Sequence, residues 1–218
     1  MKALVEQVLE LFPTESNPDS PRFVVGVAGP PTAGKTTFAE ALVKALSGRA
    51  AMLGMDAFHF DDCVLHSKGL HARKGSPPTF DVAGYCATLQ RAKAERSAEV
   101  AIPVFDRSLE LTRNAAEIIR PEHEIIVTEG NYLLFDGPWE GVADLCDVTF
   151  YLDVPMETIE HRIRERWADA GYAAAEIERR TTENDLPNAR LIEQSKTRAA
   201  AVLNTRDQIL QLRDPNPR

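Results

Sequence analysis

The sequence predicts an α/β fold with one parallel sheet of about five strands and helices on both faces. Four short apolar runs, at 23–28, 51–55, 125–128 and 148–152, are continuous rather than alternating. Such runs are typical of parallel strands that are covered on both faces. A glycine-rich turn follows the first run, and a stretch of helical periodicity follows the turn, so the first βα unit of this fold begins there.

Residues 1–21 predict a short N-terminal helix and a linker. The apolar residues of 1–12 are spaced as in an amphipathic helix, and 14–21 is rich in Pro, Ser, Asn and Asp. The helix after the glycine-rich turn is predicted at 35–47, where Gly48 ends it. We expect the fold proper to start after the linker.

A long segment, 57–124, separates the second and third apolar runs. It is polar and loop-rich at first, and its spacing then predicts a helix at 82–96 with Asp81 as the N-cap. We expect this helical insertion to bind a substrate, because segments at the carboxyl ends of strands build the sites of open α/β sheets. Farther on, 156–187 predicts an arginine-rich lid region, and 199–203 predicts a fifth strand, although its alanines also permit a helix.

Composition limits the classes of function. A length of 218 residues, 44% of them hydrophobic and 27% charged, fits a single globular domain, 1–218, with an ordinary core. The formal net charge of −8 repels a phosphate backbone and argues against nucleic acid as a partner. A homodimer is left open.

The three cysteines are odd in number, far apart and without a C-x-x-C pair. They predict neither a disulfide framework nor a zinc cluster, which suits a reducing cytoplasm. No run approaches the roughly 18 apolar residues of a membrane span, and charged residues interrupt the first 12 positions, which excludes a signal-peptide core. We therefore expect a cytoplasmic protein without membrane insertion.

The glycine-rich turn matches the pattern G-x-x-x-x-G-K-[ST] at every fixed position and lies between a strand and a helix, as that motif requires. In such a loop, backbone N–H groups and the helix N-terminus converge on phosphate oxygens. Lys35 would neutralise the β and γ phosphates of ATP, and the hydroxyl of Thr36 would hold Mg²⁺. The sequence thus predicts a P-loop NTPase; the alternative is a glycine turn that matches by chance. The residues expected to bind the nucleotide are Gly29, Pro30, Pro31, Thr32, Ala33, Gly34, Lys35, Thr36 and Thr37.

Two carboxylates follow strands that should end at the same edge of the sheet. Asp56 comes directly after the second run and could take the proton of an acceptor hydroxyl or orient that hydroxyl. Glu129 ends the third run, where a Walker B carboxylate would contact the metal or polarise the acceptor. The alternatives are a helix cap or a solvated carboxylate for Asp56 and a purely structural role for Glu129.

Two arginines of the lid region are candidates for catalysis. Wheel geometry places Arg166 beside the apolar stripe of the helix that starts at Met156, Arg162 at its margin and Arg164 opposite. Cations on such a lid stabilise the charge that develops in phosphoryl transfer. The alternative is a solvated helix with a Glu160–Arg164 pair. The stripe consists of Met156, Ile159, Ile163 and Trp167.

Polar clusters of the insertion suit a small hydroxylated acceptor, neutral or charged; the alternative is ordinary surface loops. One cluster spans 71–75 and the other 103–107. The residues expected to contact the substrate are His59, Arg73, Lys74, Asp106, Arg107, Glu129 and Tyr132.

From about Phe23 to Leu203, the chain resembles the uridine kinase, phosphoribulokinase and pantothenate kinase group of P-loop kinases. The matching segments are the loop 29–36, Met-Asp-Ala-Phe-His at 55–59, Thr-Phe-Asp at 79–81, Pro-Val-Phe-Asp-Arg at 103–107, Glu-Gly-Asn-Tyr-Leu-Leu at 129–134 and the arginine-rich lid.

The resemblance implies that Asp56 is the catalytic carboxylate, that Arg162 or Arg166 belongs to the lid, and that 184–188 and 197–198 lie near the nucleotide base. Within the group, the chain is most similar to a bacterial branch named for a fructose transport system, which implies a sugar. Residues 57–60 depart from the Ser-Phe-Tyr pattern of uridine kinases, which argues against a nucleoside acceptor.

These observations lead to one main hypothesis and two competitors. The main hypothesis is an ATP-dependent kinase that phosphorylates a hydroxyl of a small metabolite, such as fructose; a nucleoside or a pantothenate-type acceptor is the alternative. The first competitor is a nucleotide-hydrolysing regulator associated with transport, although no N-K-x-D signature is present. The second is a nucleotide-binding module without turnover, which the intact Lys35, Thr36, Asp56 and Glu129 disfavour.

Overall fold

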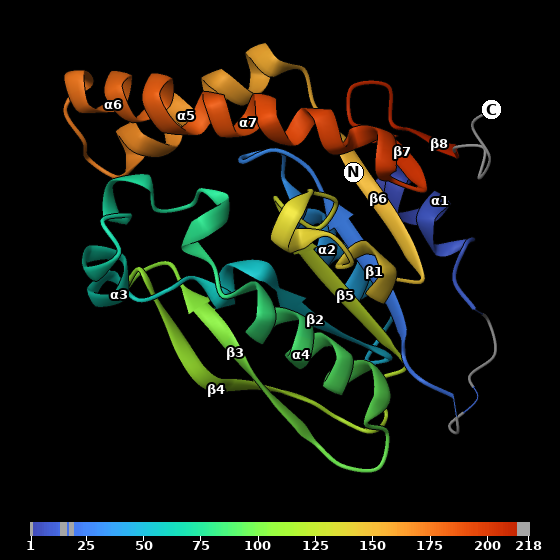
Figure 1. Ribbon diagram of the computed structural model, residues 1–218. Helices are drawn as coiled ribbons and strands as arrows, with labels where there is room; N and C mark the ends of the chain where they lie inside the picture. The colour runs from blue at the N-terminus through green and yellow to red at the C-terminus, as the bar shows by residue number, and fades with distance from the viewer. Residues whose placement is uncertain (1, 14–16, 18–19, 213–218) are drawn as a thin grey trace.

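The computed structural model describes residues 2–13, 17 and 20–212, so most of the linker predicted at 14–21 lies outside the described residues. Within them, a six-stranded sheet has the order β2-β5-β1-β6-β7-β8 (Figure 1). Its strands are β1 (Phe23–Ala28), β2 (Ala50–Gly54), β5 (Ile125–Gly130), β6 (Val148–Asp153), β7 (Ala201–Asn204) and β8 (Ile209–Leu212).

The parallel sheet predicted from the apolar runs is confirmed. Strands β2, β5, β1, β6 and β7 pair in parallel, with Val25 opposite Val127 on β5 and Val148 on β6. The segment predicted at 199–203 is a strand rather than a helix, and it begins at Ala201. Strand β8 adds an antiparallel edge that the sequence did not predict.

Helices cover both faces of the sheet, and alternate strand residues face two separate cores. Val25 and Val127 pack with α1, α2, α5 and α7, whereas Val24 and Ile126 pack with α4 and a β-hairpin. Figure 1 shows these layers, with α5 and α7 at the top and α4 and the hairpin at the bottom. The helices are α1 (Lys2–Leu9), α2 (Lys35–Ala45), α3 (Asp62–Ser67), α4 (Val82–Ala94), α5 (Met156–Asp169), α6 (Ala174–Arg180) and α7 (Leu186–Glu193).

Short helical turns join these elements. A π-helical turn, Thr181–Asp185, lies between α6 and α7. The 3₁₀ turns are η1 (Met55–Phe58), η2 (His71–Arg73), η3 (Pro77–Thr79), η4 (Gly137–Trp139), η5 (Ala143–Leu145) and η7 (Gln194–Arg198). Among the described residues, no helix has the length and the apolar character needed to cross a membrane.

The insertion 57–124 is only partly helical, which corrects the sequence-based expectation. Helix α4 is present where it was predicted, and its N-cap Asp81 accepts a hydrogen bond from the backbone N–H of Gly84 at 2.9 Å. Two further strands, β3 (Val100–Asp106) and β4 (Leu111–Ile119), form an antiparallel hairpin. The hairpin gave a weak signal because Pro103 interrupts β3 at a register shift and most of β4 is exposed.

Candidate active site

The loop 29–36 joins β1 to α2 at the carboxyl edge of the sheet, in a conformation that needs its glycines. Gly34 has a φ of 92° at the N-cap of α2, and Gly29 has a φ of 153°. A Cβ atom on Gly29 would lie 3.1 Å from the carbonyl oxygen of Leu152 on β6. Thr32 also lies in the left-handed region, at 59°, and non-glycine residues in that region often mark functional loops.

Lys35 points back over this loop rather than into solvent. Its ammonium group donates to the carbonyl oxygen of Pro30 at 2.9 Å and to the side-chain oxygen of Asn131 at 2.6 Å. Burial lowers the pKa of Lys35, while the negative charges of Glu129 and Asp56 oppose this shift. The lysine and both predicted carboxylates therefore share one electrostatic environment.

Thr36 and Glu129, the two residues predicted to hold Mg²⁺, lie next to each other at the start of α2 and the end of β5. The hydroxyl of Thr36 donates to Oε1 of Glu129 at 3.0 Å, and Glu129 is 5% exposed. Burial raises the pKa of Glu129, and the nearby charge of Asp56 raises it further. Thr37, the last residue of the predicted nucleotide site, is exposed on α2.

Asp56 lies in the turn η1 that follows β2, close to the end of β5. This approach depends on Gly130, because a Cβ atom there would lie 2.5 Å from the Cβ atom of Met55. The carboxylate of Asp56 accepts a hydrogen bond from Arg107 of the β3–β4 turn at 2.7 Å. The structure thus brings together two predicted site residues that are 51 positions apart.

The ring of His59 lies beside Asp56 and packs against two aromatic side chains. The ring packs against Phe80 at an interplanar angle of 42°, with a centroid distance of 4.0 Å, and lies 5.1 Å from the ring of Phe105. Its Nδ1 lies 2.9 Å from the backbone carbonyl oxygen of Asp56. Burial lowers the pKa of His59, which favours the neutral imidazole.

The loop 71–75 of the insertion lies near His59, because the charge of Lys74 acts on that ring. Nζ of Lys74 donates to Asp62 at 2.7 Å and to the carbonyl oxygen of Glu110 at 3.1 Å. The phenol of Tyr132, which is fully buried, donates to the carbonyl oxygen of Gly75 at 2.7 Å. Burial raises the pKa of Tyr132, whereas the charge of Arg73 acts in the opposite direction.

Asp106 differs from the other predicted substrate residues because its carboxylate serves its own turn. Oδ1 accepts hydrogen bonds from the backbone N–H groups of Ser108 and Leu109 and from the Ser108 hydroxyl. Oδ2 pairs with Arg113 at 3.2 Å. Asp106 therefore shapes the turn that carries Arg107.

The lid region contacts the loop 29–36 through α5. Arg162 donates to the carbonyl oxygen of Thr32 at 3.2 Å, and the Thr32 hydroxyl donates to the carbonyl oxygen of Ile159 at 3.4 Å. Ile159 and Ile163 of the predicted stripe are buried, which confirms the apolar face. Arg162 and Arg166 are exposed, whereas Arg164, expected on the opposite side, is half-buried and pairs with Glu160 and Glu178. The Glu160–Arg164 pair of the alternative interpretation is therefore present.

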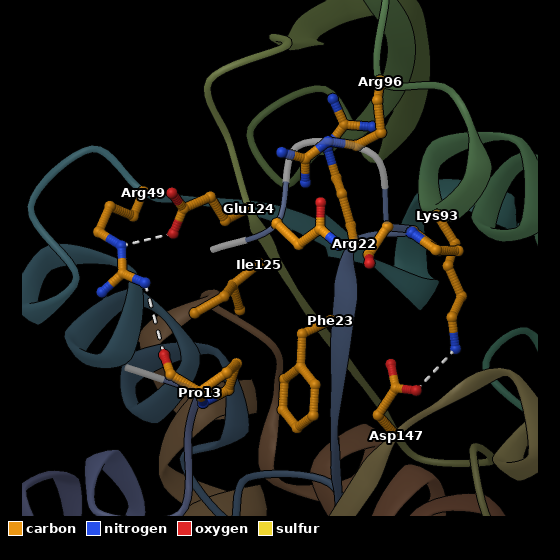
Figure 2. Close-up of a pocket in the computed structure, with 12 residues that line it drawn as sticks. Pro13, Arg22, Phe23, Arg49, Lys93, Arg96, Glu124, Ile125 and Asp147 are labelled. Atoms are coloured by element: carbon orange, nitrogen blue, oxygen red, sulfur yellow. Dashed lines mark hydrogen bonds and ion pairs between the residues drawn. The ribbon is translucent and has the colours of Figure 1, made fainter. Parts of the chain in front are cut away.

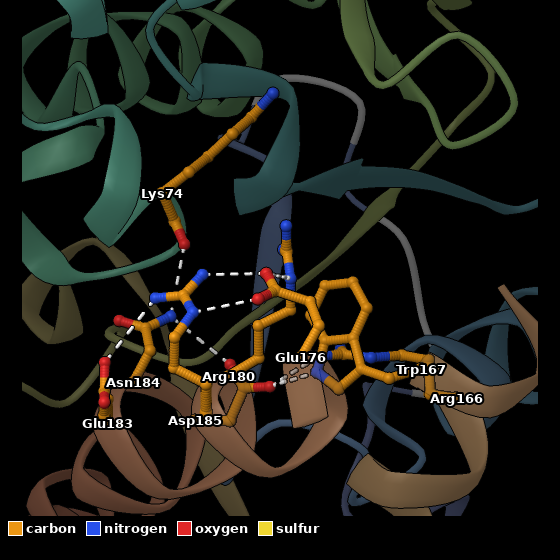
Figure 3. A network of polar contacts seen from close by, with 9 residues as sticks. Lys74, Arg166, Trp167, Glu176, Arg180, Glu183, Asn184 and Asp185 are labelled. Atoms are coloured by element: carbon orange, nitrogen blue, oxygen red, sulfur yellow. Dashed lines mark hydrogen bonds and ion pairs between the residues drawn. The ribbon is translucent and has the colours of Figure 1, made fainter. Parts of the chain in front are cut away.

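Asp185, from the π-helical turn, holds the second predicted arginine. Its Oδ2 accepts from Nε1 of Trp167 at 2.6 Å and from Arg166 at 3.2 Å. Figure 3 shows these contacts together with Arg180, whose guanidinium lies 4.7 Å from the Trp167 ring. The charge of Arg166 also acts to lower the pKa of Lys35, although burial is the main cause of that shift.

The segments implied to lie near a nucleotide base occupy two different places. Asn184 donates to the backbone carbonyl oxygen of Lys74 at 3.4 Å, as Figure 3 shows, so this end of 184–188 lies beside the insertion. Arg198 forms an ion pair with Asp136.

The predicted site residues did not include Asn131, and Asp185 entered only as part of 184–188, which the resemblance implied to lie near the nucleotide base. Asn131 follows Glu129 by two positions at the end of β5, so its place at the strand edge was a usable signal. The contact between Asp185 and Arg166 gave no such signal, because helical periodicity does not reveal a π-helical turn.

A cavity of about 330 Å³ lies at the other, amino-terminal edge of the sheet (Figure 2). Two pairs of its charged lining residues have structural roles: Arg49 pairs with Glu124 at 2.6 Å and Lys93 with Asp147 at 3.0 Å. Arg96 also lines the cavity, and its buried Nε makes no hydrogen bond with the described residues. Arg22, which is fully buried, donates to the carbonyl oxygens of Ala92, Glu95, Arg120 and His123. The predicted site residues therefore lie at the edge opposite to this cavity.

Comparisons with known proteins agree with this geometry. A "putative uridine kinase" of Schizosaccharomyces pombe is 29% identical over 194 residues, which cover 84% of this chain and 83% of the relative. A pantothenate kinase of Corynebacterium diphtheriae is 32% identical over 168 residues, which cover 74% of this chain and 53% of the relative. The chain spans about half the length of the pantothenate kinases that it matches.

A solved structure from Silicibacter sp. TM1040 has the same fold. It is described as a "putative fructose transport system kinase", is 38% identical and has a TM-score of 0.78, and the match covers 88% of this chain and 93% of that chain. The profile of the phosphoribulokinase / uridine kinase family matches residues 24–206. With the P-loop motif, the parallel sheet and these relatives, the chain belongs to the phosphoribulokinase / uridine kinase family of kinases.

Proposed function

We propose that this chain is an ATP-dependent kinase that phosphorylates a hydroxyl group of a small metabolite. The observation that carries the proposal is the meeting of Lys35, Glu129 and Asp56 at one edge of the sheet, where Glu129 accepts a hydrogen bond from Thr36 beside Lys35 and the charges of Glu129 and Asp56 both act on Lys35. Open α/β sheets bind their ligands at this edge. The kinases among its relatives support the same reaction class.

The loop 29–36 would bind the triphosphate of ATP. Its glycines let backbone N–H groups approach phosphate oxygens closely, and the N-terminus of α2 adds a partial positive charge. Lys35, already held over the loop by the Pro30 carbonyl, would contact the β and γ phosphates.

Mg²⁺ fits the residues beside this loop. Mg²⁺ prefers oxygen ligands and is usually bound by one or two protein groups together with phosphates. Thr36 and Glu129 supply such a pair of oxygens, 3.0 Å apart. The bound ion would neutralise charge on the β and γ phosphates.

Asp56 would act as the general base. As it takes the proton of the acceptor hydroxyl, the hydroxyl oxygen forms a bond to the γ-phosphorus. The bond between that phosphorus and the bridging oxygen breaks, and the bridging oxygen leaves on ADP with the electron pair. Such assistance is typically worth about 10²–10⁴-fold in rate.

The lid region, 156–187, would close over the nucleotide and supply Arg162 and Arg166. Arg162 already contacts the loop through Thr32, and Asp185 holds Arg166 nearby. Positive charge placed this way stabilises the transferring phosphoryl group. The insertion, 57–124, would bind the acceptor through the segments that carry His59 and Arg107.

A sugar is a candidate acceptor, because one similar structure is described as a "putative fructose transport system kinase". A reducing cytoplasm is consistent with Cys63, Cys86 and Cys146, which form no disulfide.

A metabolite panel with ATP and Mg²⁺ tests the proposal, with ADP release and the mass of the phosphorylated product as readouts. Lys35→Ala should abolish ATP binding or turnover. Lys44→Ala, an exposed lysine on the same helix, is the matched control and should behave like the wild type. Wild-type turnover in Lys35→Ala would refute the role of the loop. ATP hydrolysis without any phosphorylated product would instead favour a nucleotide-hydrolysing regulator.

A further inference from the structure

Of the cationic side chains in the segments near Asp56, Lys74 and Arg107 have ionic partners and Arg73 has none among the described residues. Lys74 is paired with Asp62 and Arg107 with Asp56. Within residues 2–13, 17 and 20–212, the exposed guanidinium of Arg73 makes no hydrogen bond and no ion pair. The chain has a net charge of −8. A positive side chain without an ionic partner can therefore attract an anion locally, against the overall charge.

Arg73 is carried by a loop that is held in place from three sides. The Tyr132 phenol donates to Gly75, and Nζ of Lys74 reaches the carbonyl oxygen of Glu110 in the β3–β4 turn. From the lid region, Asn184 donates to the carbonyl oxygen of Lys74, which Figure 3 shows. A loop anchored in this way holds the backbone of Arg73 beside the site, and the charge of Arg73 acts on the buried phenol of Tyr132.

Arg107 lies on the turn that Lys74 contacts, so the two guanidinium groups belong to adjoining segments. Arg107 uses one terminal nitrogen on Asp56, and 63% of its side chain is exposed. Its other N–H groups can therefore serve a ligand whose hydroxyl lies against Asp56. Planar guanidinium groups bind carboxylates and phosphates through two parallel hydrogen bonds.

We propose that the acceptor carries an acidic group, a carboxylate or a phosphate, which Arg73 binds with help from Arg107. The substrate class is then a hydroxy acid or a sugar phosphate rather than a neutral sugar or nucleoside. This inference rests on the proposed kinase function and names the substrate of the same site. Because the charge of Arg107 also acts on Lys35 and can serve the γ phosphate, Arg73 is the residue that tests it.

The experiment compares acceptors in matched pairs that differ in the acidic group, with the full chain, ATP and Mg²⁺. The pairs are D-glycerate and glycerol, D-gluconate and D-glucose, pantothenate and panthenol, and D-fructose 6-phosphate and D-fructose. We expect kcat/KM to be at least about tenfold larger for the acidic member of the preferred pair, as a charge-assisted contact allows. The first three pairs probe a carboxylate and the fourth a phosphate, so the preferred pair identifies the group.

Variants of Arg73 show whether the preference arises at this site. Arg73→Ala should lower kcat/KM for the acidic member by about 10–100-fold, mainly through KM, and lower it much less for the neutral member. Arg73→Lys should recover part of the loss, since it keeps the charge but not the planar fork. Arg91→Ala, which removes an exposed arginine of α4, is the control and should change neither member.

Three results would overturn the inference. The first is a neutral member that reacts as well as its acidic partner, and the second is an equal effect of Arg73→Ala on both members. The third is a thermal-shift measurement with a non-hydrolysable ATP analogue in which no acidic member stabilises the protein. That measurement needs no turnover, so it decides the acceptor class even if the kinase function fails in the product assay.

Discussion

The ammonium group of Lys35 donates a hydrogen bond of 2.6 Å to the side-chain oxygen of Asn131, which follows the neighbouring strand β5. The bond satisfies a buried charge over the loop 29–36. Asn131→Ala should therefore destabilise the nucleotide-free protein by about 1–3 kcal/mol, the cost of leaving a buried donor without a partner.

Saturating ATP and Mg²⁺ should shrink this loss, because phosphate oxygens can take the place of the Asn131 oxygen. Urea unfolding with and without nucleotide measures both quantities. Asn204→Ala is the control, since Asn204 caps the β7–β8 turn. The stability that this variant loses should not depend on nucleotide. An equal loss of stability in Asn131→Ala with and without ATP would contradict the proposal that phosphate oxygens replace the Asn131 oxygen at Lys35.

Replacing Asp56 by asparagine should lower kcat by about 10²–10⁴-fold while ATP binding is kept. The asparagine side-chain oxygen can still accept the hydrogen bond of Arg107, but it cannot take a proton from the acceptor. Steady-state kinetics and nucleotide titration separate the two effects. Asp61→Asn is a matched control, because Asp61 caps α3 and asparagine caps helices equally well. An unchanged kcat in Asp56→Asn would remove Asp56 as the base.

Alanine in place of Arg162 or Arg166 should reduce kcat by about 10³-fold or more and change ATP affinity much less, because their charge acts mainly on the transferring phosphoryl group. Asp185→Asn should show a weaker form of the Arg166 defect, since it removes the ionic partner of that arginine. Trp167, which donates to Asp185, offers a fluorescence signal for the same change. Arg190→Ala, on the exposed side of α7, should be neutral. Loss of thermal stability without a kinetic defect would point to a purely structural role.

The stability of the protein should fall as the pH drops from 7 towards 5, partly because of His59. Burial holds the pKa of His59 below its ordinary value of 6.5, so below that value the unfolded chain binds a proton that the folded protein binds only at lower pH. Stability therefore declines as the pH falls through 6.5 and the loss is complete below the folded-state pKa.

His59→Asn should flatten this slope, since its amide can replace the Nδ1 contact to the Asp56 carbonyl without titrating. Thermal unfolding between pH 5 and 8 measures how steeply stability depends on pH. His123, whose pKa burial also lowers, should leave a residual slope. The exposed His161 supplies the control variant His161→Asn. A slope as steep in His59→Asn as in the wild type would show that His59 does not contribute.

Local pattern was sufficient to predict the parallel sheet, the loop 29–36 and the helix that starts at Met156. The segment 57–124 was harder, because the hairpin has an exposed second strand and a proline in the first. Such strands depend on their partner for stability, and a single sequence carries little trace of that pairing.

The sequence by itself determined that Asp56 and Glu129 stand at the carboxyl ends of strands and that Lys35 starts the helix after the loop 29–36, because strand positions along the chain and turn chemistry are local properties. Only the tertiary structure decided which side chains meet there. Asp56 and Arg107 are 51 positions apart, Lys35 and Asn131 are 96 apart, and Arg166 and Asp185 are 19 apart. Each pair forms because separate elements pack against one sheet edge, and the distances that result depend on the packing of the whole core rather than on any local pattern.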